Sequence, residues 1–476
     1  MIPRVIVRQL DFLRVGEDMQ IMIVGCGKIG RDLAETLSIE NNNVTIVDKN
    51  EQVVQNMSIL YDVMGVVGNG TSYSTLKEAG LEDTDILIAV TQSDEVNLLT
   101  CVMARQKSKC HTIARVRNPI YSEERHFLRS ELQLSMTINP ELEAAREMVS
   151  ILNFPNAMEV DTLGKSDIRM FRFRNPKNSM LSGEPLGVVS QKFRGTILVC
   201  IVERGDDVII PNGDFVLQEN DIVGIIAKVR DIEKFFKAIG MPFRPVKNCM
   251  IVGGGGISYY LTRLLTMHGI KVKIIEQSLS RCGELSREFP EATVCCGDGT
   301  DRTVLDEECV ESMDSFVACT GIDEINAILS LYAQGKVRKV ITKMNHVDFN
   351  DVIDDLNLST VVNPKSIITQ KILQYVRATR NSLESNVESL YRLRGGRVEV
   401  LEFLIKGKSA AVGVPFAELN LKSEVLVAGI VRNGSLIVPG GSDCLLEGDA
   451  VIIVTTHSGF GDITDILAET SRGDRR

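Results

Sequence analysis

Short apolar runs alternate with amphipathic stretches in the first part of the chain. The apolar runs predict buried strands at 21–24, 44–47, 63–67, 86–90 and 112–116. Between them, apolar residues recur every three or four positions, which predicts amphipathic helices. A further helix is expected from Asn139-Pro140 to about residue 152. Because strand and helix alternate, we expect a parallel sheet with right-handed crossovers.

The first predicted strand leads directly into a glycine-rich turn and a helix. Gly25, Gly27 and Gly30 follow the G-x-G-x-x-G order. The first glycine permits a tight turn, the second lets backbone N–H groups approach a pyrophosphate, and the third lets the helix pack close to the strand. The helix N-terminus then faces the phosphates with its partial positive charge. We therefore predict a dinucleotide-binding turn made of Gly25, Cys26, Gly27, Lys28, Ile29 and Gly30.

The second predicted strand ends in an acid. Asp48 follows Gly25 by 23 residues, close to the spacing at which a carboxylate binds the ribose diol of a dinucleotide. A 2′-phosphate would meet a like charge there, so Asp48 favours NAD(H) over its phosphorylated form. Two further loops lie at the same edge of the sheet, where nucleotides bind in this architecture. These loops supply Gly68, Asn69, Thr91 and Gln92.

Two arginines follow the fifth predicted strand. Arg115 ends that strand and Arg117 lies two residues on, so both side chains should point to the same side. A guanidinium here would hold a phosphate through two parallel hydrogen bonds. The alternative is an ordinary surface ion pair with a carboxylate, and the spacing does not decide between the two.

Residues 157–240 or so follow a different pattern. Strands are predicted at 168–173, 196–203, 208–210 and 221–227, around turns at 204–206 and 211–214. This pattern is typical of a small α+β domain. Pro242 and Pro245 form a proline-paired hinge that marks its end.

The whole pattern then recurs, which indicates a tandem duplication of a two-domain module. The landmarks that recur at an offset of 228 or 229 residues are Gly25 and Gly253, Asp48 and Glu276, the 68–71 and 297–300 loops, Thr91 and Thr320, and Asp221 and Asp449.

The second glycine-rich turn departs from the first at one position. Ser258 replaces the third glycine, and we expect it to push the helix slightly off the strand and to loosen pyrophosphate binding. Lys343 occupies the position of Arg115, so a positive charge persists without the planar fork. The predicted second site comprises Gly253, Gly254, Gly255, Gly256, Ile257, Glu276, Asp298 and Thr320.

The predicted fold class is α/β, with two Rossmann-like parallel-sheet domains that are each followed by a small α+β domain. The Rossmann-like domains are expected at 19–138 and 247–363, and the small domains at 157–241 and 388–470. Residues 1–18 read as an extension that is not a signal peptide, and residues 469–476 as a disordered polar tail.

Composition and charge limit the classes of function that the chain can have. Across 476 residues the net charge is −10, which disfavours nucleic acid and anionic lipid as partners. No apolar run approaches the ~18 residues that would span a bilayer. The eleven cysteines show no C-x-x-C spacing and are expected to be reduced thiols or core residues. None of the five histidines belongs to a recognisable catalytic or metal-ligand pattern, so we expect no catalytic residue and no metal site.

These features resemble the TrkA family, the RCK-domain regulatory subunits of bacterial Trk potassium uptake systems. The large domains look like TrkA-N domains and the small ones like TrkA-C domains, over roughly residues 19–470. Besides the glycine turns and their acids, the resemblance rests on the 68–71 loop, Thr91-Gln92-Ser93-Asp94-Glu95, residues 113–119 and residues 210–214. The extension and Ser258 depart from the family pattern.

The resemblance implies a homo-tetrameric RCK ring that binds NAD(H) and ATP or ADP. It implies docking on a TrkH- or TrkG-type membrane subunit that translocates potassium, with the chain cytoplasmic and peripheral on the inner face of the membrane. Some TrkA-C domains bind cyclic di-AMP, and no residue pattern here decides that ligand. By the resemblance, the nucleotide-binding residues are Gly25–Ile29, Asp48, Thr91, Gln92 and Arg115 in the first half, and Gly253–Ile257, Glu276 and Thr320 in the second. A bound nucleotide would then be an effector that is not consumed; the competing reading is an NAD-linked soluble oxidoreductase.

Overall fold

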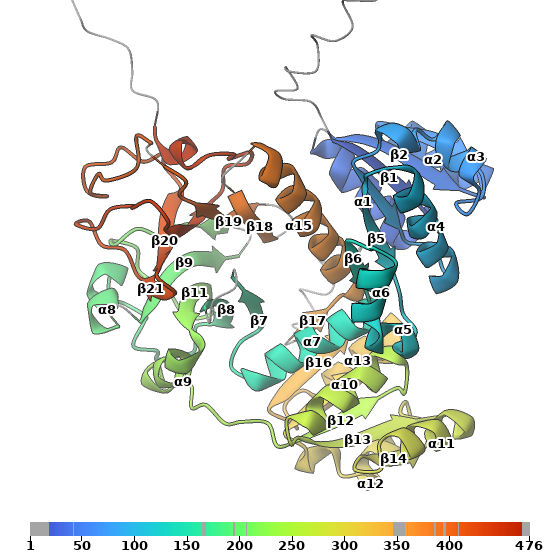
Figure 1. Ribbon diagram of the computed structural model, residues 1–476. Coiled ribbons are helices and arrows are strands. Elements are labelled where there is room, and N and C mark those ends of the chain that lie inside the picture. Colours follow the sequence, from blue (N-terminus) through green and yellow to red (C-terminus); the bar gives the residue numbers. More distant parts are fainter. Residues whose placement is uncertain are drawn as a thin grey trace, which may run out of the picture. The chain divides into compact units, whose positions relative to one another are not determined.

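The computed structural model describes residues 19–468, except 41, 164–167, 194–195, 206, 346–357, 359, 385–386, 394–396 and 408. The expected extension at 1–18 and the expected tail at 469–476 lie outside the described residues. The chain divides into two compact units, drawn in Figure 1. Unit 1 holds residues 1–140 and 365–373, and unit 2 holds residues 141–364 and 374–476.

Unit 1 is built on a six-stranded sheet in the order β3-β2-β1-β4-β5-β6, with every pair parallel. Its strands are β1 (Gln20–Val24), β2 (Asn43–Asp48), β3 (Val63–Val67), β4 (Ile86–Ala89), β5 (His111–Arg115) and β6 (Met136–Ile138). The parallel sheet predicted from the sequence is confirmed. The pattern missed β6, because three residues, two of them only half-buried, are too short to show a strand period.

Helices cover both faces of this sheet (Figure 1). They are α1 (Lys28–Ile39), α2 (Glu51–Leu60), α3 (Tyr73–Glu78), η1 (Leu81–Asp83), α4 (Asp94–Lys107), α5 (Pro119–Glu123) and α6 (Arg125–Glu131). Leu76 of α3 and Cys101 of α4 share one apolar core with Met22 and Val24 of β1. Because strand side chains alternate between faces, Ile21 and Ile23 are buried on the opposite side.

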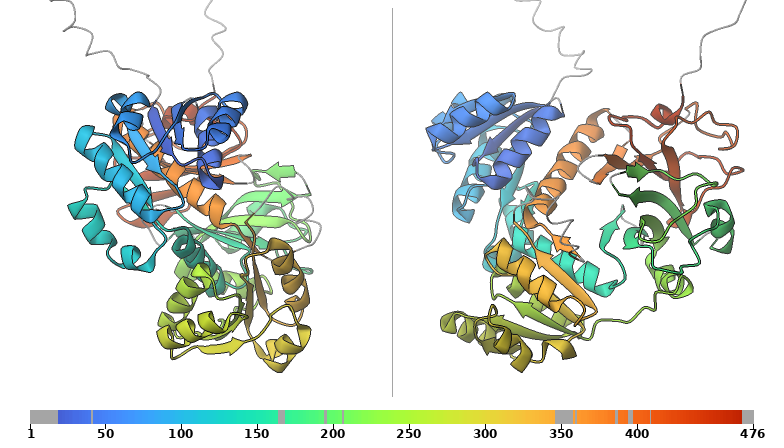
Figure 2. Two further views of the ribbon diagram at one scale, coloured as in Figure 1. Left: turned by 90° about the vertical axis from the view of Figure 1, so that its right-hand side faces the viewer. Right: turned by 180° about the vertical axis from the view of Figure 1, so that it is seen from behind.

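Unit 2 repeats this sheet in the order β14-β13-β12-β15-β16-β17, again all parallel. Its strands are β12 (Asn248–Val252), β13 (Lys271–Glu276), β14 (Thr293–Cys296), β15 (Ser315–Ala318), β16 (Lys339–Lys343) and β17 (Val361–Val362). Its helices are α10 (Gly256–Met267), α11 (Leu279–Glu288), α12 (Arg302–Glu307), η2 (Val310–Ser312) and α13 (Asp323–Ala333). The left view of Figure 2 shows helices on both faces of this second sheet.

Two long helices link the modules. They are α7 (Pro140–Asn153) and α15 (Pro364–Glu384). From Glu141 onwards α7 belongs to unit 2, whereas residues 365–373 of α15 belong to unit 1. There Lys365 Nζ lies 2.8 Å from Asp32 Oδ1 of α1. A segment from the second half of the chain therefore completes unit 1, which the repeat pattern alone does not indicate.

Unit 2 also holds two small antiparallel sheets, in the orders β10-β9-β11-β8-β7 and β18-β19-β22-β20-β21. The first comprises β7 (Glu159–Thr162), β8 (Ile168–Arg174), β9 (Ile197–Arg204), β10 (Asp207–Ile209) and β11 (Ile222–Lys228), with α8 (Leu186–Lys192) and α9 (Val229–Ala238). The second comprises β18 (Val387–Leu393), β19 (Val398–Leu404), β20 (Val425–Arg432), β21 (Ser435–Ile437) and β22 (Ala450–Thr455), with η4 (Ile463–Ile466).

The two small sheets share an apolar core. Met170 and Ile226 of the first sheet belong to one buried cluster with Val400 and Ile452 of the second. Each sheet also has a separate core on its other face. Apolar side chains therefore line both faces of each small sheet. One apolar face of each small sheet packs against the other small sheet. The sequence pattern did not predict this contact between the two sheets.

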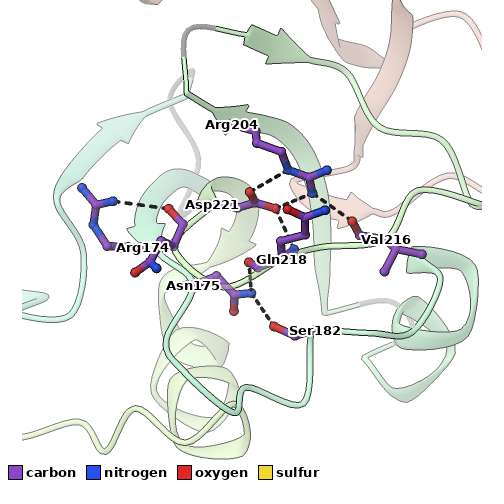
Figure 3. Close-up of polar contacts among 8 residues, drawn as sticks. Arg174, Asn175, Ser182, Arg204, Val216, Gln218 and Asp221 are labelled. Atoms are coloured by element: carbon purple, nitrogen blue, oxygen red, sulfur yellow. Dashed lines mark hydrogen bonds and ion pairs between the residues drawn. The ribbon is translucent and has the colours of Figure 1, made fainter.

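A charged contact fixes the turn before β11. Arg204 donates from Nε to Asp221 Oδ1 at 2.9 Å and from Nη2 to Asp221 Oδ2 at 2.8 Å (Figure 3). The Gln218 N–H donates to the same Oδ2 at 2.8 Å, and Arg204 Nη2 also donates to the Val216 carbonyl at 3.0 Å. The Asp221 side chain is almost fully buried, so the fork satisfies a carboxylate that water does not reach.

The same contact occurs in the second small domain, 228 residues later. Arg432 donates to both carboxylate oxygens of Asp449 at 2.8 Å, and the Leu446 N–H donates to Oδ2 at 2.8 Å. Asp221 and Asp449 were landmarks of the repeat, and the structure gives the physical reason for that pairing.

We expect Asp221→Asn to loosen the first small domain by about 1.5–3 kcal/mol, the range for hydrogen bonds to charged groups, with partial exposure of Arg204 favouring the lower end. The measurement is hydrogen-exchange protection of β11, corrected for intrinsic exchange rates. Strand β22 serves as an internal reference because the Arg432–Asp449 pair is intact, and Asp214→Asn, at an exposed turn position, is the control variant.

The stability difference between the wild-type chain and Asp221→Asn should depend on pH with a defined sign. Burial acts to raise the pKa of Asp221, but hydrogen bonds from Arg204 and the Gln218 N–H outweigh it and lower the pKa below 3.8. The pair therefore stabilises the domain fully above that value, and the stabilisation is lost as pH falls through the lowered pKa. A wild-type advantage that stayed constant in strong acid would contradict this account.

Candidate functional site

The first glycine turn has a backbone that only glycine adopts readily. Gly25 has φ of +101°, and its N–H donates to the Val47 carbonyl at 2.9 Å. A Cβ at Gly25 would lie 2.8 Å from the Thr91 nitrogen, and one at Gly30 would lie 2.0 Å from the Gly25 carbonyl oxygen. The turn, the start of α1 and the 91–92 loop therefore approach one another more closely than side chains permit.

The acid of the first site is bound to this turn. Asp48 Oδ2 accepts a hydrogen bond from the Cys26 N–H at 2.7 Å, and Oδ1 accepts one from the Asn50 N–H at 2.9 Å. The carboxylate thus links the end of β2 to the residue after the first glycine. It lies where the sequence predicted a ribose-binding acid, beside the N-terminus of α1.

The second site repeats this arrangement with a glutamate. Glu276 Oε2 accepts from the Gly254 N–H at 2.6 Å, and Oε1 accepts from the Ser278 N–H at 2.7 Å. Gly253 has φ of +101°, the same as Gly25. The longer side chain of Glu276 therefore reaches the same backbone position as Asp48.

The loop after the third strand is also the same in both halves. The Gly68 N–H donates to the Asp48 carbonyl at 2.9 Å, and Asn69 Oδ1 accepts from the Thr71 N–H at 3.2 Å. In the second half, Asp298 takes the place of Asn69 and accepts from the N–H and hydroxyl of Thr300. These two hydrogen bonds lower the pKa of Asp298 below its ordinary value.

A buried asparagine, which the sequence analysis missed, holds the loop at Thr91. Asn97 Oδ1 accepts from the Thr91 N–H at 2.8 Å and from its hydroxyl at 2.7 Å, while Nδ2 donates to the Arg115 carbonyl at 2.9 Å. Asn326 makes the same three hydrogen bonds with Thr320 and Lys343. Recurrence of asparagine at an offset of 229 was the signal that could have revealed this residue.

The two arginines after β5 reach the same loop. Arg115 Nη1 donates to the Thr91 carbonyl at 3.4 Å, and Arg117 Nη2 donates to the Gln92 carbonyl at 2.6 Å. In the second half Lys343 Nζ donates to the Thr320 carbonyl at 2.9 Å. The residues after the fifth strand therefore bring positive charge to the 91–92 loop and to its counterpart.

Ser258 is accommodated through its hydroxyl. Its side chain is fully buried and Oγ donates to the Gly253 carbonyl at 2.5 Å. The cap residues Gly27 and Gly255 keep nearly identical torsions, with φ of −69° and −70°. Because the equivalent Cβ in the first site would lie 2.0 Å from the Gly25 carbonyl oxygen, the serine requires a wider separation between helix and turn.

Each turn also meets an arginine that the repeat did not predict. Arg31 Nε of α1 donates to the Cys26 carbonyl at 3.3 Å, and Arg281 Nε of α11 donates to the Gly254 carbonyl at 2.7 Å. The two arginines come from different helices and are not counterparts in the repeat. The two sites therefore share their backbone geometry but differ in how they place positive charge.

The Cys26 thiol of the first turn stays protonated at neutral pH. Burial, and next the Asp48 charge, raise the pKa of the Cys26 thiol to about 12. Over the described ranges, no three histidine, cysteine, aspartate or glutamate residues gather in a way that could hold a metal ion. Among those residues, no helix is both long and apolar enough to cross a membrane.

Comparison with known proteins identifies the family. The TrkA-N domain model matches residues 21–140 and 249–364, and the TrkA-C domain model matches residues 170–240 and 400–468. The chain belongs to the TrkA family. Both TrkA-N matches contain a glycine turn with its acid, and both TrkA-C matches contain the Arg–Asp contact.

Named relatives resemble the chain over almost its whole length. It is 31% identical to a Trk system potassium uptake protein TrkA homolog 1 of Methanosarcina mazei, over 94% of this chain and 99% of that protein. It is 29% identical to the Trk system potassium uptake protein TrkA of Halomonas elongata, over 91% of this chain and 95% of that protein. The GsuK channel bound to NAD shares the fold, with a TM-score of 0.61 at 17% identity over 94% of this chain and 80% of that one.

We expect Asp48→Asn to weaken NADH binding at the first TrkA-N domain by about 1.5–3 kcal/mol, or roughly 10- to 100-fold in Kd, because an amide replaces a charged acceptor. Isothermal titration of the full chain measures it, and Lys49→Ala, at the exposed position next along the chain, is the control. The hydrogen-exchange protection of Gly25–Gly27 separates loss of the ribose contact from loss of the turn. Unchanged affinity in Asp48→Asn would exclude the ribose assignment.

Proposed function

We propose that this chain is the nucleotide-binding regulatory subunit of a potassium uptake system, with its two TrkA-N domains as effector sites. The observation that carries the proposal is the acid-bound glycine turn, which occurs twice at the carboxyl edge of a parallel sheet. The relatives named as Trk potassium uptake proteins support the link to potassium.

The proposed effectors are NAD(H) and ATP or ADP. Asp48 and Glu276 supply carboxylates for an unphosphorylated ribose, and the N-termini of α1 and α10 supply backbone N–H groups for phosphates. Positive charge comes from Arg115 in the first site and Lys343 in the second. Cyclic di-AMP is a separate ligand to test on the TrkA-C domains.

The proposed mechanism is a shift between states of an oligomeric ring. A nucleotide changes the gate only to the extent that it binds one ring conformation more tightly than another. The partner is a TrkH- or TrkG-type membrane subunit, on which a homo-tetramer of this chain docks from the cytoplasmic side. The net charge of −10 favours a protein partner over anionic lipid.

The first site gives a test of the phosphate assignment. Arg115→Lys should weaken ATP binding by about tenfold, because the charge remains but the planar fork is lost. A lysine preserves the contact with the loop, since Lys343 Nζ already donates to the Thr320 carbonyl in the second half. Lys343→Arg is the matched control, in which ATP affinity should not fall. Wild-type ATP affinity in Arg115→Lys would exclude a bidentate clamp.

Reconstitution tests the function as a whole. The purified chain should form an oligomer and float with liposomes only when these contain the potassium-translocating subunit, because the acidic chain has no attraction for anionic lipid. NADH or ATP should then alter potassium flux without being consumed. Flotation with empty liposomes would point to a lipid anchor. Steady NADH oxidation on a small substrate, without docking, would favour the oxidoreductase alternative.

A further inference from the structure

Two thiols lie together beneath the acid of the second site. Cys282 belongs to α11, and its Sγ donates to the Glu276 carbonyl at 3.2 Å. Cys296 ends β14 directly opposite Glu276 in the strand register, and its Sγ lies 3.9 Å from the Gln277 carbonyl oxygen. The two sulfurs thus lie beside consecutive carbonyls. Burial, and next the nearby Cys296 side chain, raise the pKa of the Cys282 thiol.

The neighbouring cysteine belongs to a different environment. Cys295 packs on the apolar core that contains Met250 and Leu305, and its thiol interacts with Glu308. Successive strand residues point to opposite faces, which places Cys295 and Cys296 on different sides of β14. The sequence analysis expected all eleven cysteines to be reduced thiols or core residues because none has a C-x-x-C spacing, and Cys282 and Cys296 follow no known motif.

The first half of the chain lacks this pair. Its counterparts are Val54 on α2, at an offset of 228, and Val67 at the end of β3, at an offset of 229. Val54 is buried and Val67 is exposed, as are Cys282 and Cys296 respectively. The fold therefore needs only small apolar side chains at these two positions, and valine is a native replacement for each thiol.

The thiols are connected to the nucleotide site by short contacts. The Glu276 carbonyl that accepts from Cys282 also accepts from the Gly297 N–H at 3.0 Å, and the Glu276 carboxylate holds the Gly254 N–H. Arg281, the residue before Cys282, donates to the Gly254 carbonyl at 2.7 Å. A movement of Cys282 therefore shifts the first turn of α11 and the charged group that it places on the glycine turn.

We propose that Cys282 and Cys296 form an oxidation site. A small-molecule disulfide oxidises the two thiols to an intramolecular disulfide, and this bond lowers nucleotide affinity at the second TrkA-N domain. The coupling to affinity rests on the proposed nucleotide site; the disulfide itself does not. Among the described residues, the pair belongs to no group of three or more histidine, cysteine, aspartate or glutamate residues that could hold a metal ion.

The exchange begins at the exposed thiol. Cys296 loses its proton and attacks a sulfur of the oxidant, which forms a mixed disulfide and releases one thiolate. Burial, and next the interaction with Cys296, raise the pKa of Cys282 to about 11, so Cys282 acts second. It gives up its proton and attacks Cys296 Sγ, which forms the internal disulfide and releases the second thiolate. In sum, two protein thiols are oxidised and one small disulfide is reduced to two thiols.

Closure must disturb the site. A disulfide brings its sulfurs to about 2 Å, closer than thiols in van der Waals contact, so the Cys282 sulfur leaves the Glu276 carbonyl and loses its donor hydrogen. The first turn of α11 moves with it and takes Arg281 away from the glycine turn. Both changes weaken the network that presents the Glu276 carboxylate, so affinity for a ribose-containing nucleotide falls.

Peptide mapping of the full chain tests the bond. The reduced protein is treated with oxidised glutathione, its free thiols are blocked with N-ethylmaleimide, and trypsin is added. Cleavage after Arg281, Arg287 and Arg302 puts Cys282 and Cys296 on separate peptides, 282–287 and 288–302. We expect these peptides to be linked, with the link lost in Cys282→Val and Cys296→Val and kept in Cys295→Val. No link, or a link that requires Cys295, would overturn the proposal.

Titration of NADH tests the coupling, in an Asp48→Asn background that weakens the first site. We expect oxidation to raise the Kd of the second site about tenfold, reversibly on reduction, and to leave the Cys296→Val variant unchanged. A linked protein with unaltered affinity would overturn the coupling. If the reduced protein fails to bind any nucleotide at the second site, the proposed nucleotide site is wrong, whereas peptide mapping still decides whether the thiols pair.

Discussion

The two nucleotide-binding folds depend on one interaction, a carboxylate that binds the backbone of a glycine turn. Asp48 and Glu276 each accept a hydrogen bond from the N–H just after the first glycine, at 2.7 and 2.6 Å, and another from the start of the next helix. The carboxylate thus fixes the end of the second strand against the glycine turn. A ligand that engages this acid therefore acts on backbone that connects a strand, a turn and two helices.

The duplication acts as an internal comparison, because it shows which features the fold requires and which it leaves free to vary. Both halves keep the +101° glycine, the buried asparagine beneath the threonine loop and the Arg–Asp fork of the small domain. They differ at Ser258, at the residues that place positive charge, and at the paired thiols. The shared features support the turn, the threonine loop and the small domain, whereas the differing ones change the packing and the charge around the turn.

The arrangement also explains why small domains accompany the nucleotide-binding folds. Each small sheet has its own core and contributes to a common one in which Met170 and Val400 are buried together. A sheet with two apolar faces is stable only when both are covered, so the two small domains stabilise each other. In unit 1, residues 365–373 of α15 complete the first nucleotide-binding fold, so neither half of the duplication is self-contained.

The sequence by itself determined the parallel sheets, the duplication and the chemistry of the glycine turns, because these follow from local periods and fixed spacings. Each of these signals lies within one short stretch of sequence: the apolar strand runs, the G-x-G-x-x-G turn and the acid 23 residues after its first glycine. Strand β6 was missed because three residues, two of them only half-buried, are too few to show a strand period. Asn97 was missed because a single polar residue on a helix does not indicate which loop it supports, and only its recurrence at Asn326 marks it in the sequence.

Only the tertiary structure decided which distant groups meet. The fork between Arg204 and Asp221, the arginines on the two turns, and the convergence of Cys282 and Cys296 beneath Glu276 all join residues from different elements. No one-dimensional pattern specifies such contacts, because they depend on the register of parallel strands and on how each helix packs over them. The exposed or buried state of a thiol likewise exists only once α11 covers β14. That packing determines which of the eleven cysteines lie close together.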